Sequence, residues 1–485
     1  MSLFEDLSNF FSMLSLIGVQ QLSWGWKAFI IYGLIFLLFA LLSLIQSVVG
    51  CATILWRFRE VPAEDIYRII RSNSLPEITF VVPAYNERKD IVHTVKNMLS
   101  LSYRYKKIII INDGSTDNTF ELLKTNFYLY PVPPSCPGHF ETSHIKSYYA
   151  SKHHPALLVI DKVNGGKADA LNAGLNATTS EFVVCADADT LVDDLALNRL
   201  IRPFLLHPET VAAHASIGNV NGCTIKDNRI VEVKFPQKLL LGFQVIDFMK
   251  GFLVERLGVS WTKGTLVIPG NFGMFRLSAL IEIGGYDRTS IIEDTEIITR
   301  MHKYYLDRKR PYRITYIPDI VAWTEAPNTI KTLGKQRLRW YKGTTQNIWE
   351  YRSMWFNPRY RSIGLYIIPM TLLEKAAPLI EMSGFVILGM ALFDSQVDPI
   401  LVLSIASISW GFLTLLVMLT LVIEYIAYET YKTWTDFGRM MKCVACYTCY
   451  HYLLMWWRIR GLYAPKPKKP GWTPIREGYE ETQHH

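Results

Sequence analysis

The sequence has 485 residues, of which 50% are hydrophobic and only 19% are charged. This balance excludes a disordered chain and is too apolar for an ordinary soluble enzyme of this length. The 51 Lys and Arg residues exceed the 43 Asp and Glu residues, and the resulting net charge of +8 suits an anionic substrate or anionic lipid headgroups. No basic run or stripe stands out, so we expect no nucleic-acid partner.

One long uncharged apolar run near the N-terminus predicts a membrane anchor. Residues 28–56 contain no charged side chain, and a helix of this length reaches roughly 40 Å, enough to cross a bilayer with tilt. Arg57 and Arg59 follow directly, which favours a cytosolic position for the chain that comes next. We therefore expect residues 1–60 to form an interfacial segment, at 8–19, and a transmembrane helix of an integral plasma-membrane protein.

Apolar runs return in the C-terminal part, at 363–393, 399–424 and 443–457. The 399–424 run is expected to span the membrane. The basic tail that follows residue 457 favours a cytosolic C-terminus. Three spans would leave this tail outside, so at least one run must be re-entrant, interfacial or split, and the number of spans stays open. Residues 346–485 are assigned to interfacial helices, transmembrane helices and the tail.

Two local patterns accompany the first of these runs. The stretch 344–362 mixes tryptophans with arginines, which is typical of an amphipathic helix in the interface, although a plain surface helix has the same pattern. Glu374 and Lys375 lie inside the run. They either face a cavity or a partner helix, or mark a headgroup-level break between two helices. The sequence leaves both alternatives open.

Between the apolar ends, residues 61–345 are predicted to form a cytosolic α/β domain with the catalytic function. Short β-rich runs alternate with helical patterns over 77–187, which predicts βαβ units around a parallel sheet. The stretch 127–155, rich in Tyr, Pro and His, interrupts the alternation and is predicted to be an inserted loop.

Polar clusters follow four of the predicted strands. In open α/β sheets the ligand binds beyond the carboxyl ends of the strands. The clusters found there are 85–87 (Tyr-Asn-Glu), 112–115 (Asn-Asp-Gly-Ser), 165–167 (Gly-Gly-Lys) and 187–189 (Asp-Ala-Asp). Neither a GxGxxG fingerprint nor a P-loop is present, which makes hydride transfer and P-loop hydrolysis poor candidates.

Asp187 and Asp189 stand two residues apart at a strand end, where their carboxylates can hold a hard divalent ion together with phosphate oxygens. Alone this pattern is weak, because surface loops often carry such pairs. Its weight comes from the three other clusters at the same edge of the sheet.

Three later motifs add further chemistry. Residues 270–273 (Gly-Asn-Phe-Gly) follow an apolar run and would form a backbone-lined cavity wall. The acidic pair in 292–294 (Ile-Glu-Asp) opens a helical pattern, which by itself is explained by the helix dipole. Residues 336–340 (Gln-Arg-Leu-Arg-Trp) suit a pyrophosphate and a stacked ring, although a basic interfacial helix shares the pattern.

The order of these motifs, PAYNE, NDGSTD, GGKADALN, DAD, IED and QRLRW, resembles the family-2 membrane glycosyltransferases. This family makes and exports polysaccharides and includes cellulose, hyaluronan, chitin and poly-N-acetylglucosamine synthases. The likeness covers residues 75–345 and extends to the flanking apolar runs. It implies a Rossmann-like GT-A domain docked on transmembrane and interfacial helices that form the polymer channel. It also implies an inverting, metal-dependent enzyme that polymerises a UDP-sugar and exports the product.

The resemblance also implies roles for individual residues. UDP would be bound by Tyr85, Glu87, Asp113, Lys167, Asp187, Gln336 and Arg339. Mg²⁺ or Mn²⁺ would be bound by Asp189 and Asp187. The general base would be Asp294, with Glu293 beside it in the catalytic pair. The acceptor sugar would lie against Trp340, Gly270 and Asn271.

Two positions depart from the pattern of the relatives. Ile292 stands where many relatives have threonine, which puts the hydrogen bond that supports the base in question but not the base itself. Asn112 precedes Asp113 where relatives carry paired aspartates.

The chemistry that the resemblance implies is consistent with these residue types. A base that takes the proton of the acceptor hydroxyl contributes about 10²–10⁴ in rate, and the departing UDP needs charge stabilisation. Two products stay open, a β-glucan from UDP-glucose and poly-β-N-acetylglucosamine from UDP-GlcNAc. The alternatives are a non-processive membrane enzyme that transfers one sugar to a lipid acceptor, and a transport protein with a non-catalytic domain. Expected partners are the UDP-sugar donor, the growing polysaccharide and the lipid bilayer; control by cyclic-di-GMP would need an accessory subunit.

Overall fold

The computed structural model describes separate helical positions between 27 and 52 and, as continuous segments, residues 75–134, 138–256, 265–393, 399–428 and 430–463, with Val259 between two of them. The predicted interfacial segment at 8–19, most of the predicted transmembrane helix at 28–56 and the tail beyond 463 lie outside the described residues. The predicted domain bounds at 60 and 345 stay predictions.

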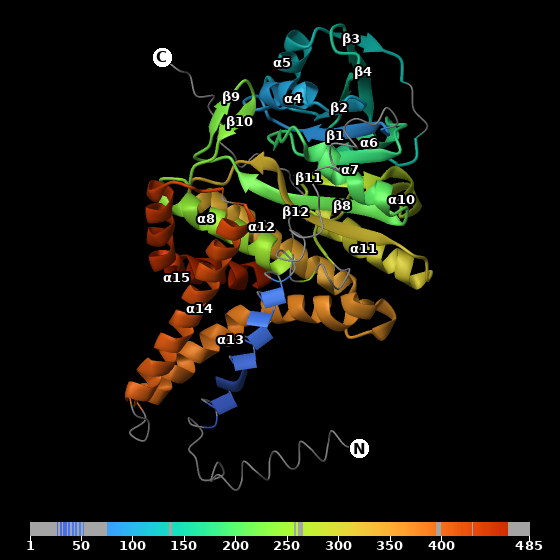
Figure 1. The fold of residues 1–485 in the computed structure, drawn as a ribbon. Coiled ribbons are helices and arrows are strands. Elements are labelled where there is room, and N and C mark those ends of the chain that lie inside the picture. The colour runs from blue at the N-terminus through green and yellow to red at the C-terminus, as the bar shows by residue number, and fades with distance from the viewer. Residues whose placement is uncertain are drawn as a thin grey trace.

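A ten-stranded mixed sheet forms the centre of the α/β part (Figure 1). The strand order is β3-β4-β5-β2-β1-β6-β11-β8-β12-β7. The strands are β1 (Ile78–Ala84), β2 (Lys106–Asp113), β3 (Leu129–Val132), β4 (Ile145–Ser151), β5 (Leu157–Lys162), β6 (Phe182–Ala186), β7 (Leu191–Val192), β8 (Thr210–Asn219), β11 (Phe272–Arg276) and β12 (Arg313–Thr324). A separate antiparallel hairpin consists of β9 (Thr224–Lys226) and β10 (Arg229–Glu232).

The predicted parallel pairing is right for one part of this sheet. Strands β5, β2, β1 and β6 run parallel in register, and β12 runs parallel to β8. Strand β11 pairs antiparallel with both β6 and β8, and β7 pairs antiparallel with β12. The sheet is therefore mixed, with the predicted βαβ units at its centre.

The prediction of an inserted loop over 127–155 is wrong. Strands β3 and β4 lie within this stretch, pair antiparallel with each other and extend the sheet beyond β5. Tyr148 and Tyr149 of β4 pack against the core, as β-favouring aromatic residues do on a half-buried sheet. Pro131 suggested a loop, but it stands in the edge strand β3, where proline is tolerated.

Alternating side chains of the central strands enter two different cores. Phe80 and Ile110 face one side of the sheet, whereas Val81 and Ile111 face the other. Both faces are buried, which explains why these strands are continuous apolar runs. The covering helices are α4 (Ile91–Ser100), α5 (Thr119–Asn126) and α7 (Ala196–Leu206) on the first face, and α6 (Lys167–Asn176), α10 (Leu277–Glu282) and α11 (Glu293–Asp307) on the second.

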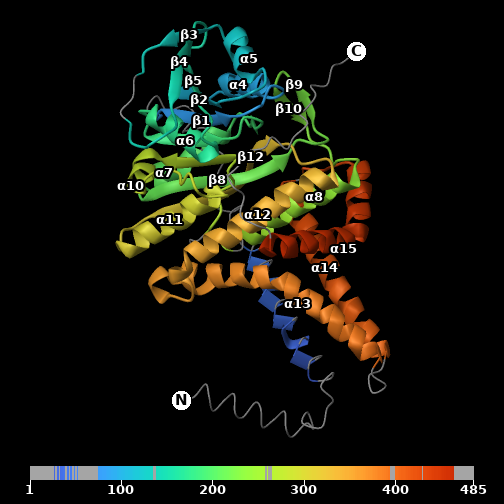
Figure 2. The same cartoon turned by 180° about the vertical axis from the view of Figure 1, so that it is seen from behind.

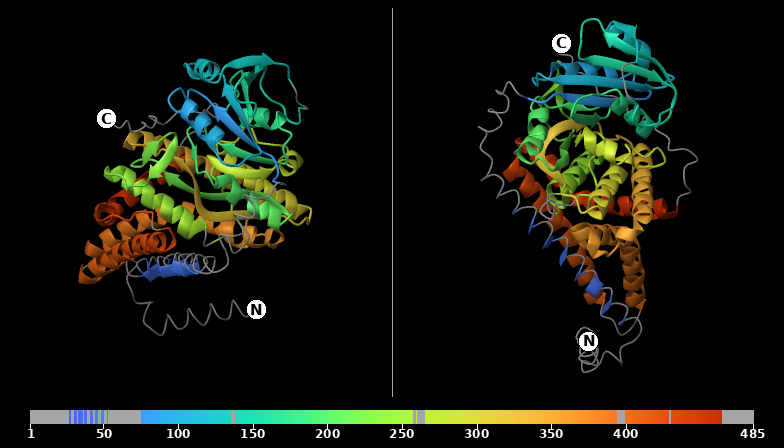
Figure 3. Two further views of the ribbon diagram at one scale, coloured as in Figure 1. Left: turned by 45° about the horizontal axis from the view of Figure 1, so that its top comes forward. Right: turned by 90° about the vertical axis from the view of Figure 1, so that its right-hand side faces the viewer.

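Further helices pack below strands β8 and β12 (Figure 2). They are α8 (Leu239–Met249), which continues into a π-helical segment (Lys250–Arg256), α12 (Ile330–Glu350) and α15 (Trp434–Tyr463). Helices α13 (Ile368–Phe393) and α14 (Pro399–Ala427) project away from the α/β part, and the described positions between 27 and 52 lie on the same side (Figure 3).

The three C-terminal apolar runs are helical, as expected. Among the described residues, the helical stretch Ile363–Ile387 alone has the length and apolar composition needed to cross a membrane, and Trp410–Ile426 is a shorter apolar helix. The predicted span over 399–424 therefore stays a prediction.

The stretch 344–362 is not the single amphipathic helix that the sequence suggested. Helix α12 ends at Glu350, and two 3₁₀ turns follow at Arg352–Met354 and Pro358–Tyr360. Pro358 has no backbone N–H that could donate a helical hydrogen bond. The Asn357 side chain caps the second turn by accepting a hydrogen bond from Arg359 N at 3.0 Å.

Lys375 lies inside continuous helix α13, so no helix break occurs at this position. Its Nζ donates to the backbone oxygen of Tyr341 on α12 at 3.4 Å and lies 4.8 Å from the centre of the Tyr341 ring. Of the two alternatives, the structure favours an ionisable group that faces a partner helix.

Candidate active site

The loops after β1 and β2 are bound to each other through Asn86. Its Oδ1 accepts hydrogen bonds from the backbone N of Thr116 at 2.8 Å and of Asp117 at 3.2 Å. Asn86 has a φ of 58°, a left-handed conformation that asparagine tolerates. This loop pairing places the half-buried side chains of Tyr85 and Glu87 at the carboxyl ends of the parallel strands, where the sequence predicted them.

Asp113, at the end of β2, is fully buried and binds protein groups on both oxygens. Its Oδ1 accepts from Lys162 Nζ at 2.7 Å and from Gly165 N at 3.0 Å, and its Oδ2 accepts from Gly166 N at 2.8 Å. Asp113 therefore fixes the glycine loop that precedes Lys167. Its predicted contact with uridine stays a prediction.

The sequence interpretation missed Lys162. This lysine ends β5 and is fully buried, although lysine is almost never buried without a partner. The signal available in the sequence was a charged residue at the end of an apolar strand. This strand, β5, pairs directly with β2, which also ends in polar residues.

Lys167, the first residue of α6, connects three segments that are distant in sequence. Its Nζ lies 2.6 Å from Asp187 Oδ1, 2.9 Å from Glu293 Oε1 and 3.3 Å from the backbone oxygen of Gly270. Burial disfavours the charged form of Lys167, but the two carboxylates outweigh burial and raise its pKa. The structure thus brings three other predicted site residues, Asp187, Glu293 and Gly270, to the side chain of Lys167.

The acidic pair opens α11, as the sequence predicted. Asp294 Oδ2 accepts from Gly270 N at 3.0 Å, and its Oδ1 accepts from Thr295 N at 2.8 Å. Burial, with the negative charge of Glu293, raises the pKa of Asp294. Burial also acts to raise the pKa of Glu293, but the positive charges of Lys167 and Arg339 outweigh it and lower that pKa. The two carboxylates therefore differ in proton affinity, the arrangement that acid–base catalysis uses.

The residues after β6 are suited to a divalent ion. Asp187 N donates to the backbone oxygen of Asn271 at 3.2 Å, so the loop with Asp187 and the buried Asp189 borders the segment 270–271. Carboxylate oxygens are the ligands that Mg²⁺ and Mn²⁺ prefer. In the part of the chain that the structure describes, no group of three or more His, Cys, Asp or Glu side chains is placed to hold a metal. The donor set fits an ion whose other ligands are diphosphate oxygens and water.

The QRLRW motif lies on α12, and its two arginines have different surroundings. Arg337 is buried, pairs with Asp247 Oδ2 on α8 at 2.6 Å, and its guanidinium lies 4.7 Å from the centre of the Trp340 ring. Arg339 Nε is buried and makes no hydrogen bond to the described residues. Its charge acts on Glu293, which places Arg339 on the side of the acidic pair. Asp247, the partner of Arg337, was not predicted from the sequence.

Gly343 allows α12 to approach the acidic pair closely. A Cβ at this glycine would lie 2.4 Å from Ile292 Cγ2, a distance at which one of the two groups must move. Ile292 is the N-cap of α11 and directly precedes Glu293. Ile292 therefore packs against α12.

Comparison with known families follows the same segments of the chain. The model of "Glycosyl transferase family group 2" matches residues 182–458, and that of "Glycosyl transferase family 2" matches residues 79–129. The chain belongs to glycosyl transferase family group 2. Its α/β part is accordingly a GT-A-like fold with a large mixed sheet.

Curated relatives of this glycosyl transferase include poly-beta-1,6-N-acetyl-D-glucosamine synthases. That of Staphylococcus epidermidis is 31% identical over 291 residues, 60% of each chain. That of Staphylococcus aureus (strain COL) is 30% identical over 300 residues, 62% of this chain and 61% of the relative. The match thus spans about 60% of the length of these relatives.

The chain is also similar, at low sequence identity, to two solved structures. A mannosyltransferase from Pyrobaculum calidifontis, in complex with GDP-Man and Mn²⁺, is 18% identical with a TM-score of 0.47 and covers 84% of this chain and 98% of its own. S. aureus TarS 1–349 in complex with UDP-GlcNAc is 15% identical with a TM-score of 0.34, and the match covers 56% of this chain and 66% of the TarS chain.

Proposed function

We propose that this family-2 glycosyltransferase is an inverting enzyme that polymerises a UDP-sugar into a β-linked polysaccharide, with UDP-GlcNAc as the donor. The observation that carries the proposal is the acidic pair, in which Asp294 has a raised pKa beside Lys167 and the Asp187 loop. The choice of N-acetylglucosamine rests on the names of the Staphylococcus relatives.

The proposed reaction starts with a proton transfer to Asp294. Its carboxylate accepts the proton of the acceptor hydroxyl, and the hydroxyl oxygen forms a bond to the anomeric carbon of the donor sugar. The bond between that carbon and the UDP oxygen breaks, and UDP leaves with the electron pair. Attack from the face opposite to UDP converts an α-linked donor into a β-linked product.

Cationic groups would stabilise the leaving diphosphate. Arg339 has a buried Nε without a hydrogen bond to the described residues, and Lys167 lies between the two acidic segments. A divalent ion held by Asp187 and Asp189 would supply further positive charge at the diphosphate. Tyr85 and Glu87, on the coupled strand-end loops, would bind the nucleoside end of the donor.

The acceptor would lie along α12. Trp340 is half-buried next to Arg337, and an aromatic ring offers an apolar face on which a sugar can stack. Helices α13 and α15 contact α12, α14 packs against both of them, and together they would guide the growing chain into the membrane. Export across the plasma membrane, with a cytoplasmic catalytic domain, is part of this proposal.

The test is UDP release by detergent-solubilised full-length protein with Mg²⁺ or Mn²⁺, supplied separately with UDP-GlcNAc, UDP-glucose or UDP-glucuronate. We expect turnover of UDP-GlcNAc into a high-mass product that a β-N-acetylglucosaminidase degrades. A product that a β-glucanase degrades would replace N-acetylglucosamine by glucose in the proposal. UDP release with a single-sugar lipid product would support the non-processive alternative, and no turnover of any donor would overturn the enzymatic proposal.

A further inference from the structure

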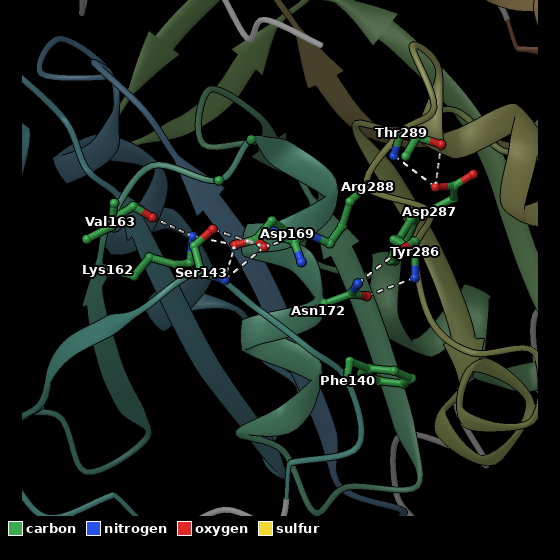
Figure 4. Close-up of polar contacts among 12 residues, drawn as sticks. Phe140, Ser143, Lys162, Val163, Asp169, Asn172, Tyr286, Asp287, Arg288 and Thr289 are labelled. Carbon is green, nitrogen blue, oxygen red and sulfur yellow. Dashed lines mark hydrogen bonds and ion pairs between the residues drawn. The ribbon is translucent and has the colours of Figure 1, made fainter. Parts of the chain in front are cut away.

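A charge cluster around Asp169, buried except for Arg288, continues from Asp113 of the candidate active site; Figure 4 shows Asp169 with Lys162 and Arg288. Asp169 on α6 is fully buried and is contacted by two cations, Lys162 Nζ at 2.5 Å and Arg288 Nε at 2.9 Å. Lys162 in turn lies 2.7 Å from Asp113. The four residues form a chain of alternating charge from the end of β2 to the loop that precedes α11.

The same face of α6 binds two loops through polar side chains. Asp169, Asn172 and Asn176 have the spacing i, i+3, i+7, so they share one face of the helix. Asn172 exchanges two hydrogen bonds with the backbone of Tyr286, at 2.8 and 2.9 Å. Asn176 does the same with the backbone of Phe140, at 2.9 and 2.8 Å.

Asp169 is the member of this face that reaches both loops. Its Oδ2 accepts from the backbone N of Ser143 at 3.0 Å and pairs with Arg288 on the other loop. Gly165 approaches it so closely that a Cβ there would lie 2.3 Å from Asp169 Oδ1. Asp169 therefore contacts the glycine loop, the 138–144 segment and the 284–289 loop at one point.

These contacts act on the position of the acidic pair. The 284–289 loop precedes Glu293 and Asp294 in the chain, and Asn172 and Asp169 hold it at Tyr286 and Arg288. A buried polar network in which each member is satisfied restricts the conformations of the segments that it joins. The opposite end of the network is Asp113, which fixes the loop before Lys167.

We propose that Asp169 is a positioning residue, which through Arg288 and Lys162 sets the placement of the acidic pair relative to the donor-side strands. The proposal rests on the proposed glycosyl transfer and extends it to residues that contact neither substrate. A change at Arg288, the end of the network opposite to Asp113, misplaces the base and slows the chemical step. Donor binding persists, because the loops after β1 and β2 are also joined through Asn86.

The test compares Arg288→Gln with Arg288→Lys and with the control Arg104→Gln. Arg288 is 43% exposed, so its substitution is compatible with folding, and Arg104 is an exposed arginine next to β2 at the end far from the site. We expect Arg288→Gln to lower kcat on the order of 10-fold or more with little change in the donor KM. Arg288→Lys restores part of kcat, because it keeps the positive charge next to Asp169.

Two results would overturn the proposal: a kcat for Arg288→Gln equal to that of Arg104→Gln, or a change confined to the donor KM. Hydrogen–deuterium exchange supplies a readout that does not depend on turnover. Peptides covering residues 284–296 should exchange faster in Arg288→Gln than in Arg104→Gln, and equal exchange in the two variants contradicts the positioning role. Absence of turnover in the wild type would instead count against the proposed function. The comparison of hydrogen–deuterium exchange between Arg288→Gln and Arg104→Gln would still decide the positioning role of Asp169 through Arg288.

Discussion

At the scale of single residues, the account depends on two adjacent carboxylates with opposite pKa shifts. Burial and Glu293 raise the pKa of Asp294, whereas Lys167 and Arg339 overcome burial and lower the pKa of Glu293. Glu293 thus stays ionised and makes Asp294 a better proton acceptor. This difference in pKa favours Asp294, the second acid of the pair, as the proposed base.

The first prediction concerns the base itself. Asp294→Asn removes the proton acceptor but keeps the size of the side chain, so UDP release should fall by about 10²–10⁴-fold. Asp319→Asn is the matched control, because Asp319 is 48% exposed and its ion pair with Arg199 is long, at 3.7 Å. Steady-state UDP release from both purified variants checks the prediction, and equal loss in the two would contradict it.

The second prediction concerns pH. Asp294 must be ionised to accept a proton, so kcat falls as the pH drops through its raised pKa, above the ordinary value of 3.8. Glu293→Gln removes the negative charge that raises this pKa, and the acidic limb of the kcat profile should move to lower pH. Glu232→Gln, at an exposed glutamate of β10, serves as the control. A limb that stays in place or moves to higher pH would show that Glu293 does not tune Asp294.

At the scale of elements, the contact between α11 and α12 couples the acidic pair to the QRLRW motif. The two helices are also joined by a hydrogen bond from Asn347 Nδ2 to Thr299 Oγ1 at 2.9 Å. Gly343 faces Ile292 with no room for a Cβ. The position of Asp294, the proposed base, therefore depends partly on residues of the neighbouring helix α12.

The third prediction tests this contact. Glycine to alanine usually stabilises a helix by about 0.5–1 kcal/mol, but Gly343→Ala forces a methyl group against Ile292. We expect a lower melting temperature and a lower kcat, because the acidic pair shifts. Ile292→Ala in the same chain removes the atoms that clash and should recover part of both losses.

The control for this double-mutant cycle is Gly438→Ala on α15, where a Cβ would meet nothing within 4 Å. This variant should have unchanged or slightly higher stability. Strict additivity of Gly343→Ala and Ile292→Ala would mean that the two positions do not interact.

Local sequence patterns predicted the elements but not their distant partners. The polar ends of β1, β2 and β6 were predictable because an apolar strand followed by polar residues is a local signal. The pairing of β4 with β5 depends on contacts between segments, and the Tyr, Pro and His content of residues 127–155 suggested a loop instead. Asp247 and Asp169 were missed for the same reason: their partners, Arg337 and Arg288, are far away in the sequence.

At the scale of the whole molecule, one end is the α/β part and helices α13 and α14 project from the other end (Figure 3). Met382 and Val386, one turn apart on α13, are 46% and 60% exposed, and Leu403 on α14 is 62% exposed. Apolar side chains exposed in such number on projecting helices indicate a membrane or protein contact. These exposed side chains support the proposed membrane contact of α13 and α14.

The fourth prediction tests the membrane contact. Lysine at the centre of a span costs about 2.5–3.5 kcal/mol, so Met382→Lys with Val386→Lys should reduce the carbonate-resistant membrane fraction. Leu206→Lys is the control, since Leu206 is 59% exposed on α7 of the α/β part. Equal membrane retention of the double variant and the wild type would contradict the assignment of α13 to the bilayer.

The most direct test of the account is incorporation of labelled sugar from UDP-GlcNAc into a high-mass product by the full-length protein in membranes. The account predicts β-linked polymer from the wild type and from Asp319→Asn, and about 10²–10⁴-fold less from Asp294→Asn. Polymer formation by Asp294→Asn at the wild-type rate would contradict it, because the acidic pair would then play no part in glycosyl transfer.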